Sequence, residues 1–265
     1  MRAVPLHQAD EVARYGGKAA GLARCVAAGL PVPEGVALSW RLVEAWLEGA
    51  PEALHALAAV EELLRHGPVA VRSSAVGEDG ERASYAGQHA TVLGVRSMEA
   101  VHAAVRTVHL SRRSSEAYRA RRELDGELRM AVVVQRLVPA RCAGVLFTRC
   151  PVSKRDERVA EVNWGLGETV VSGEALPDRL RWHRGGHNLR CDVGDKDVRA
   201  VVGPEGLTHE TVPPELRAAP CLGLREVQAL EQLAATCESL FGPSDLEFAV
   251  EAGHSWLLQC RPVTT

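Results

Sequence analysis

The C-terminal segment of the chain predicts a β-hairpin that holds polar side chains in fixed pairs. Two alternating runs flank a turn centred on Gly253. Symmetric pairing about this turn sets Glu247 opposite Gln259. The same register sets Asp245 opposite Arg261. Because strand residues alternate between two faces, all four polar side chains are expected on one surface.

The hairpin alone leaves two interpretations of this surface open. The oxygens of Glu247 and Gln259 are hard ligands of the kind that Mg²⁺ prefers, and the guanidinium of Arg261 is a charge-assisted donor to phosphate. The set therefore suits a magnesium-bound polyphosphate. The alternative is a cross-strand salt bridge with two solvated polar neighbours, which surface hairpins often carry.

The charge balance of the chain limits the partners that it can attract over a distance. Its 265 residues include 31 Lys and Arg against 34 Asp and Glu, which gives a net charge of −3. No global basic field therefore favours nucleic acid or an anionic membrane, and any phosphate binding must come from local placement. The length accommodates a sizeable core in one large domain or in two lobes.

Cysteine spacing and hydropathy predict the compartment. The seven cysteines are odd in number, scattered and never spaced as Cys-x-x-Cys, so neither a disulfide framework nor a cysteine zinc site is expected. The N-terminal segment has no apolar signal-peptide core, and no apolar run approaches the ~20 residues that span a bilayer. The sequence predicts a soluble, cytoplasmic chain.

Hydrophobic periodicity predicts helices and strands mixed along the chain, followed by the terminal hairpin. This order is typical of the α+β class. The expected helices cover residues 18–28, the part of 45–65 that follows Pro51, 98–124 and 225–241. The expected strands cover residues 69–71, 91–95, 131–138 and 143–148.

Three further side chains have chemistry that fits a nucleotide, although each also has a structural explanation. Lys18 follows two glycines at a predicted helix start and could bring an ammonium to phosphate, or could be an exposed helix-start lysine. Arg72 is expected at a strand end before a glycine-bearing loop, where it could contact phosphate or pair with a loop carboxylate. Gln135 lies in an apolar strand and needs a partner, either an adenine edge or a backbone group.

Short motifs follow one another in a fixed order along the chain. They are Gly16–Leu22 with Gly29–Gly35, Val69–Ala75, Ser84–Gln88, Gly144–Thr148, Asn163–Glu168, Asp245–Glu247 and Trp256–Pro262. Together they resemble the ATP-binding domain of the pyruvate phosphate dikinase and phosphoenolpyruvate synthase family. The resemblance covers essentially the whole chain.

This resemblance implies an ATP-grasp fold of the α+β class, with two interleaved lobes that enclose a nucleotide cleft. Residues 1–265 would form a single ATP-grasp module that binds ATP and Mg²⁺. The implied catalytic groups are Lys18, Arg72 and Arg261. The implied nucleotide contacts are Lys18 and Arg72 on the phosphates, Gly87 and Thr91 in the phosphate-covering loop, Gln135 at the base, Glu247 and Gln259 as magnesium ligands, and Arg261 on the phosphates.

The resemblance also implies a reaction. In this family the ATP domain passes the β-phosphate of ATP to a histidine on a separate swivelling domain and releases AMP and phosphate. No Thr-Ser-His phosphoacceptor motif occurs in residues 1–265. We therefore expect the histidine domain and the acceptor domain outside this segment, so that the histidine arrives in trans from a partner. Two alternatives stay open: a direct ATP-grasp kinase or ligase that releases ADP, and a catalytically silent ATP-binding regulatory module.

Overall fold

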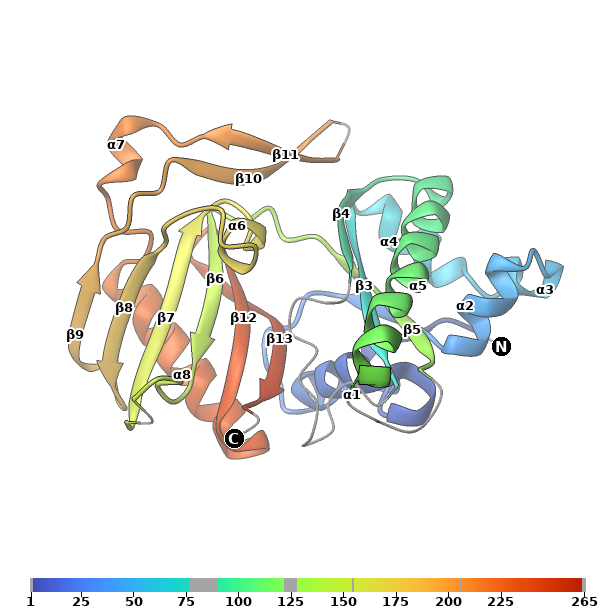
Figure 1. Cartoon of the computed structure of the whole chain (residues 1–265), viewed down its shortest axis with the longest axis horizontal. Helices are drawn as coiled ribbons and strands as arrows, with labels where there is room; N and C mark the ends of the chain where they lie inside the picture. The colour runs from blue at the N-terminus through green and yellow to red at the C-terminus, as the bar shows by residue number, and fades with distance from the viewer. Residues whose placement is uncertain (1, 77–89, 122–127, 154, 205, 264–265) are drawn as a thin grey trace. The chain divides into compact units, whose positions relative to one another are not determined.

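The computed structural model describes residues 2–76, 90–121, 128–153, 155–204 and 206–263 (Figure 1). The chain divides into two compact units. Unit 1 contains residues 1–29 and 33–137, and unit 2 contains residues 30–32 and 138–263. Each unit combines helices with an antiparallel sheet, so the predicted α+β class is confirmed. No helix in the described part of the chain is both long and apolar enough to cross a membrane.

Unit 1 is built around a five-stranded sheet in the order β1-β2-β5-β3-β4, in which all neighbours are antiparallel. Its elements in chain order are β1 (Val4–Pro5), the 3-10 helix η1 (Leu6–Gln8), α1 (Val12–Ala27), β2 (Gly35–Leu38), α2 (Trp40–Leu47), α3 (Pro51–His55), α4 (Ala58–Arg65), β3 (Val69–Ala75), β4 (Thr91–Val95), α5 (Met98–Arg121) and β5 (Met130–Arg136).

The two faces of this sheet have different roles. Val71 on β3 and Val134 on β5 point to one face and are fully buried in a core with Leu42 of α2 and Val105 of α5. Figure 1 shows α5 lying along β3 and β4. Residues of the alternate positions, such as Arg72, point to the other face, which α1 contacts. The sheet therefore presents polar side chains on the face opposite its main core.

Two predicted elements of unit 1 have different bounds in the structure. The strand expected over 69–71 continues to Ala75 because β5 pairs with it as far as Met130, so Arg72 lies in mid-strand instead of at a strand end. The helix expected after Pro51, up to residue 65, is two helices, α3 and α4, and Pro51 starts α3 as expected. A further helix that the sequence did not predict, α2, precedes them and ends before Gly49, which has φ 81°.

Unit 2 is built around a six-stranded antiparallel sheet in the order β13-β12-β6-β7-β8-β9, with a separate two-stranded sheet of β10 and β11. Its elements are β6 (Cys142–Phe147), β7 (Glu157–Trp164), α6 (Glu168–Val171), β8 (Asp178–His183), β9 (His187–Asp192), β10 (Val198–Gly203), β11 (Gly206–Thr211), α7 (Pro214–Arg217), α8 (Leu224–Phe241), β12 (Ser244–Glu251) and β13 (His254–Pro262).

A buried ionic network ties α8 to this sheet. Arg158 of β7 is 1% exposed and bonds Glu231 at 3.1 Å and Glu238 at 2.7 Å, both on α8. The indole of Trp182 on β8 donates to the same Glu231 at 2.8 Å. Because a buried charge is costly unless it is paired, these contacts satisfy a guanidinium that could not otherwise lie inside. They fix α8 on the face of the sheet that carries Arg158.

Candidate functional site

Arg72 lies on the polar face of the unit 1 sheet, deep in the structure. Only 6% of the residue is exposed. Its register partner on β4 is Thr91, and its partner on β5 is Val133. Directly opposed residues of antiparallel strands share a face. The fold therefore brings Arg72 and Thr91 side by side, although they are far apart in the sequence.

Gln135 joins the same face from β5. Its register partner is Ala70, two residues from Arg72 on β3. Gln135 is 2% exposed, and its amide nitrogen donates to the backbone oxygen of Pro33 at 3.1 Å. This backbone contact is one of the two partners that the sequence left open. The predicted contact of Gln135 with the nucleotide base stays a prediction.

Gly16 lets α1 approach this face closely. The helix is interrupted at Gly16, where φ is 79° and ψ is 170°. A Cβ at this position would lie 2.0 Å from the backbone oxygen of Ser74. The hydroxyl of Ser74 donates to the oxygen of Tyr15 at 2.6 Å and accepts from the nitrogen of Ala19 at 3.0 Å. Ser74 therefore bridges the interruption and fastens α1 to β3, a role that sequence reasoning missed.

Lys18 is the second residue after this interruption and is half-buried. The helical turn that carries it begins at Gly17, so the predicted position near a helix N-terminus is confirmed, although α1 as a whole starts earlier, at Val12. Gly87, the other predicted contact in unit 1, lies outside the described residues. Unit 1 thus supplies Lys18 and Arg72 as cations on elements that pack together.

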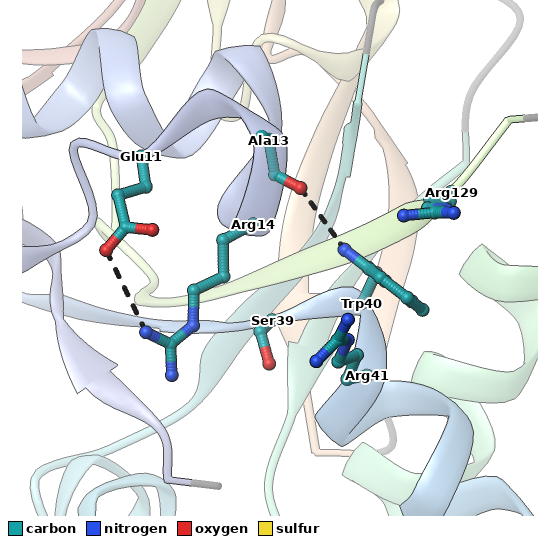
Figure 2. Close-up of a pocket in the computed structure, with 7 residues that line it drawn as sticks. All are labelled: Glu11, Ala13, Arg14, Ser39, Trp40, Arg41 and Arg129. Atoms are coloured by element: carbon teal, nitrogen blue, oxygen red, sulfur yellow. Dashed lines mark hydrogen bonds and ion pairs between the residues drawn. The ribbon is translucent and has the colours of Figure 1, made fainter. Parts of the chain in front are cut away.

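A cationic pocket of about 490 Å³ also lies in unit 1 (Figure 2). Its lining contains Arg14, Arg41 and Arg129, with the carboxylate of Glu11 paired to Arg14 at 3.8 Å. The guanidinium carbons of Arg41 and Arg129 lie 5.0 and 4.3 Å from the ring centre of Trp40. Three guanidiniums against one carboxylate make this lining net positive. The pocket is lined by none of the residues predicted to contact phosphate.

The hairpin of unit 2 has the predicted pairs. Glu247 is the register partner of Gln259, and Asp245 is the register partner of Arg261. The turn contains only Ala252 and Gly253 between the paired ends of the strands, instead of being centred on Gly253. A bulge next to Glu247 adds one residue to β13 and restores the predicted register.

Arg261 and Asp245 form a two-pronged ion pair. The Nε and Nη2 atoms of Arg261 donate to the two oxygens of Asp245 at 3.1 and 2.6 Å. Burial raises the pKa of the Asp245 carboxyl above its usual range, and the hydrogen bond from Arg261 opposes this rise. The salt bridge that the sequence named as an alternative is therefore present. Through it, Asp245 also holds the guanidinium on the side of the strand pair that carries Glu247.

The donor set of the hairpin fits Mg²⁺. Glu247 offers a carboxylate and Gln259 an amide oxygen from directly opposed positions, and both residues are half-buried. Mg²⁺ binds through few protein oxygens together with water and substrate phosphates, so two such ligands are enough.

The class of protein that these observations define is a two-unit α+β protein with cationic and oxygen-bearing groups suited to a polyphosphate. Residues 48–265 match the family model described as "Pyruvate phosphate dikinase, AMP/ATP-binding domain". The chain belongs to this family. Membership confirms the resemblance found in the sequence, carries with it the implied ATP-grasp fold and supports ATP as the ligand.

Three curated proteins are similar to this chain in sequence. The chain is 39% identical over 202 residues to a probable phosphoenolpyruvate synthase of Methanothermobacter thermautotrophicus, which covers 74% of this chain and 30% of the relative. It is 30% identical over 292 residues to the uncharacterized phosphotransferase YvkC of Bacillus subtilis, and this match covers 100% of this chain and 35% of the relative. It is 32% identical over 281 residues to the prodigiosin synthesizing transferase PigC of Serratia marcescens, and this match covers 95% of this chain and 32% of the relative. The chain thus spans about a third of the length of these relatives.

Solved structures show a partial likeness. A Pyrococcus horikoshii protein is 17% identical and has a TM-score of 0.47, with coverage of 97% of this chain and 94% of that chain. The D-alanine–D-alanine ligase of Bacillus anthracis in complex with ATP is 9% identical and has a TM-score of 0.40, with coverage of 92% and 54%.

Proposed function

We propose that this chain is the ATP-binding part of a dikinase-type phosphotransferase, which binds ATP with Mg²⁺ and passes a phosphoryl group to a histidine supplied in trans. The observation that carries the proposal is the register of the hairpin, which sets Glu247 opposite Gln259 beside the Arg261 pair. Family membership supports the same nucleotide.

The cations of the chain contact the phosphates in this proposal. Lys18 follows the glycine interruption of α1, and Arg72 lies on the strand to which α1 is fastened. A phosphoryl group in transfer spreads negative charge over its oxygens, and fixed cations stabilise that charge with little covalent work by the protein. Arg261 acts in the same way and is held in orientation by Asp245.

Glu247 and Gln259 hold the magnesium ion in this proposal. When bound, Mg²⁺ supplies positive charge to the phosphate oxygens and orients the polyphosphate. The carboxylate of Glu247 also balances the charge of the cations around it. Gln135 contacts the base and Gly87 belongs to the loop that covers the phosphates. Thr91, expected in that loop from the sequence, is instead the first residue of β4, where it pairs with Arg72 and lies beside the same phosphates in this proposal.

The acceptor is a histidine on a separate domain in this proposal. The chain spans about a third of relatives that carry the names phosphoenolpyruvate synthase, phosphotransferase and transferase. A domain that carries the histidine is therefore expected as a partner, either on another chain or on a longer form of this one. The histidine would attack the β-phosphorus and displace AMP, and water would then cleave the β–γ bond, which releases inorganic phosphate and leaves the β-phosphoryl group on the histidine.

The nucleotide product tests the proposal. Purified protein is incubated with Mg²⁺ and ATP, with and without a candidate histidine domain, and the nucleotides are separated by chromatography. AMP that forms only with the partner is the expected result. ADP would instead indicate a direct kinase or ligase. Tight ATP binding without turnover under every condition would indicate a regulatory module.

A further inference from the structure

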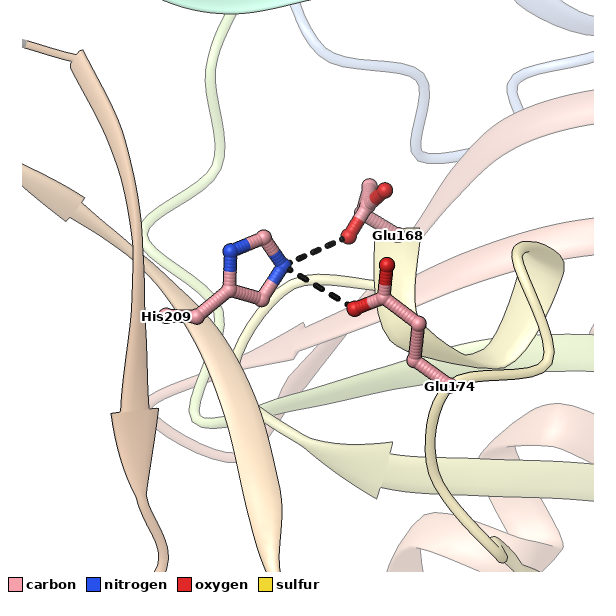
Figure 3. Close-up of side chains that lie close together, drawn as sticks. All are labelled: Glu168, Glu174 and His209. Atoms are coloured by element: carbon pink, nitrogen blue, oxygen red, sulfur yellow. Dashed lines mark hydrogen bonds and ion pairs between the residues drawn. The ribbon is translucent and has the colours of Figure 1, made fainter.

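We propose that unit 2 carries a second metal site, for a transition metal ion of the zinc type, formed by Glu168, Glu174 and His209 (Figure 3). The Nε2 atom of His209 lies 3.0 Å from a carboxylate oxygen of Glu168 and 3.4 Å from one of Glu174. One ligand atom from each residue lies within 4.8 Å of the other two. None of these residues belongs to the set proposed for ATP and Mg²⁺.

Two of the three ligand separations match those around a bound ion. Zinc binds imidazole nitrogen at about 2.0 Å and carboxylate oxygen at about 2.0–2.2 Å in tetrahedral geometry, which separates its ligand atoms by roughly 3.3 Å. The separations of 3.0 and 3.4 Å lie on either side of this value. The third pair, the carboxylate oxygens of Glu168 and Glu174, lies within 4.8 Å, and side-chain rotations that bring these two oxygens closer would complete the ligand set for one ion. The three residues are partly exposed, which leaves room for water as a fourth ligand.

The charges of the cluster favour a cation. One ring nitrogen can donate only one hydrogen, yet two carboxylate oxygens face it (Figure 3). With two carboxylates and one imidazole, the cluster keeps a net negative charge whether the histidine is neutral or protonated. A divalent ion at the point where the three groups converge would remove the repulsion between the carboxylates.

The backbone holds the three ligands in place independently of any ion. His209 is the register partner of Ala200 on β10, so both residues face the same way. The oxygen of Ala200 accepts from the nitrogen of Leu166 at 2.8 Å, just before α6. Gly165 with φ 74° allows this approach, because a Cβ there would lie 2.2 Å from the same oxygen.

A buried asparagine fastens α6 to β10 in addition. The amide of Asn163 donates to the hydroxyl of Thr169 at 2.9 Å and to the oxygen of Val198 at 2.8 Å. Glu168 starts α6 and Glu174 follows its end, so both carboxylates lie on a segment that is anchored to the strand pair of His209. Such prior organisation lowers the cost of assembling a metal site.

The donor types select the ion. One imidazole and two carboxylates are borderline ligands, which suit Zn²⁺ and, more weakly, Mn²⁺, whereas Mg²⁺ prefers oxygen ligands alone. The site would therefore fill with zinc in the presence of millimolar magnesium. Bound zinc would clamp the β10–β11 strand pair to α6.

Zinc titration by calorimetry tests the site. For the titration, the protein is prepared without a histidine tag, freed of metal with a chelator and kept in millimolar Mg²⁺. The parent carries Cys191→Ser, which removes the exposed thiol as a competing ligand. We expect one Zn²⁺ per chain and at least a tenfold loss of affinity in His209→Ala. Glu174→Gln should show the same loss, and it is the safer variant for folding because the Glu174 side chain is 51% exposed. His187→Ala, an exposed histidine on β9, is the matched control and should bind as the parent does.

Cobalt provides a second readout, because its absorption spectrum reports the ligands. We expect the bands of a nitrogen and oxygen site in the parent and their loss in Glu174→Gln. Absence of saturable zinc binding in the parent, unchanged affinity in both His209→Ala and Glu174→Gln, or a thiolate band with cobalt would overturn the proposal.

Discussion

At the scale of single residues, the polar groups of the proposed ATP site depend on neighbours that have no ligand role themselves. Ser74 fastens the turn that carries Lys18, and Asp245 holds Arg261. Removing the Arg261 side chain, for example, therefore disturbs Asp245 as well as any bound phosphate. The clearest effects are expected at Gly16 and in the Asp245 pair.

Gly16→Ala should destabilise unit 1 strongly. Gly16 has φ 79° and ψ 170°, a conformation that essentially only glycine adopts and that costs a residue with a Cβ about 1–3 kcal/mol. The new atom would also lie 2.0 Å from the oxygen of Ser74. Overpacking of this kind adds about 1–3 kcal/mol. Gly29→Ala is the matched control, since Gly29 has φ 73° but no heavy atom within 4 Å of the position that a Cβ would take. Urea unfolding should show a loss of about 1 kcal/mol for the control and at least twice that for Gly16→Ala. Equal losses would mean that the close approach is unimportant.

Arg261→Met should raise the pKa of Asp245 further, because the hydrogen bond that opposes the effect of burial is lost. A carboxyl whose pKa is raised in the folded state contributes most stability below its unfolded pKa, and this contribution is lost as pH rises through the folded pKa. The variant should therefore lose more stability than the parent between acid and neutral pH. Side-chain carbon NMR follows the titration directly.

Arg181→Met is the control for this titration. Arg181 and Asp192 form an exposed pair on the same sheet at 2.7 Å. Its removal should leave the titration of Asp245 unchanged. An unshifted Asp245 in Arg261→Met would show that the pair does not set its pKa.

At the scale of elements, the C-terminal hairpin combines a two-residue turn with a bulge. Ala252 and Gly253 have φ of 49° and 79°, the combination that a type I′ turn requires. Alanine adopts this conformation at a cost, whereas asparagine tolerates it. The turn and the bulge together fix which residues of β13 face Glu247 and Asp245.

Ala252→Asn should therefore stabilise the protein by about 0.5–1 kcal/mol, because it creates the Asn-Gly pair that this turn favours. Ala28→Asn is the control, since Ala28 is exposed at a helix end and has φ −83°. Urea unfolding of both variants provides the measurement. A destabilised Ala252→Asn, or an equal gain in the control, would contradict the turn assignment.

The hairpin also shows what the sequence could and could not predict. The predicted partners of Glu247 and Asp245 are correct, because the alternation of side chains permits few registers. The turn that produces this register differs from the predicted one. The sequence predicted a longer turn and no bulge. The structure has a two-residue turn and one extra residue in β13, Leu258, and these two differences cancel in the register. A bulge leaves no clear mark in a single sequence, so only its effect on the register could be anticipated.

Other elements were beyond the reach of sequence patterns. No strand was assigned over residues 178–211, where the structure has β8, β9, β10 and β11. Strand β9 is exposed on nearly all positions, so it lacks the alternation of buried and exposed residues that identifies a strand. The cluster of Glu168, Glu174 and His209 depends on those strands and could not be found from spacing.

At the scale of the whole molecule, the residues proposed to bind ATP are divided between the two units. Unit 1 contributes Lys18 and Arg72, and unit 2 contributes Glu247, Gln259 and Arg261. The net charge is only −3, so ATP would be recognised by local groups. Because the proposed ATP contacts come from both units, a substitution in either unit is expected to weaken binding of the same nucleotide.

Calorimetric titration of ATP in the presence of Mg²⁺ measures this dependence. Lys18→Met in unit 1 and Glu247→Gln in unit 2 are compared with matched controls on the same elements, Arg24→Met on α1 and Glu251→Gln on β12. We expect one ATP per chain, a loss of affinity of about tenfold or more in each test variant, equal to about 1.4 kcal/mol, and little change in the controls. Full affinity in Glu247→Gln, with the fold intact by circular dichroism, would contradict the assignment of the hairpin to the ATP site.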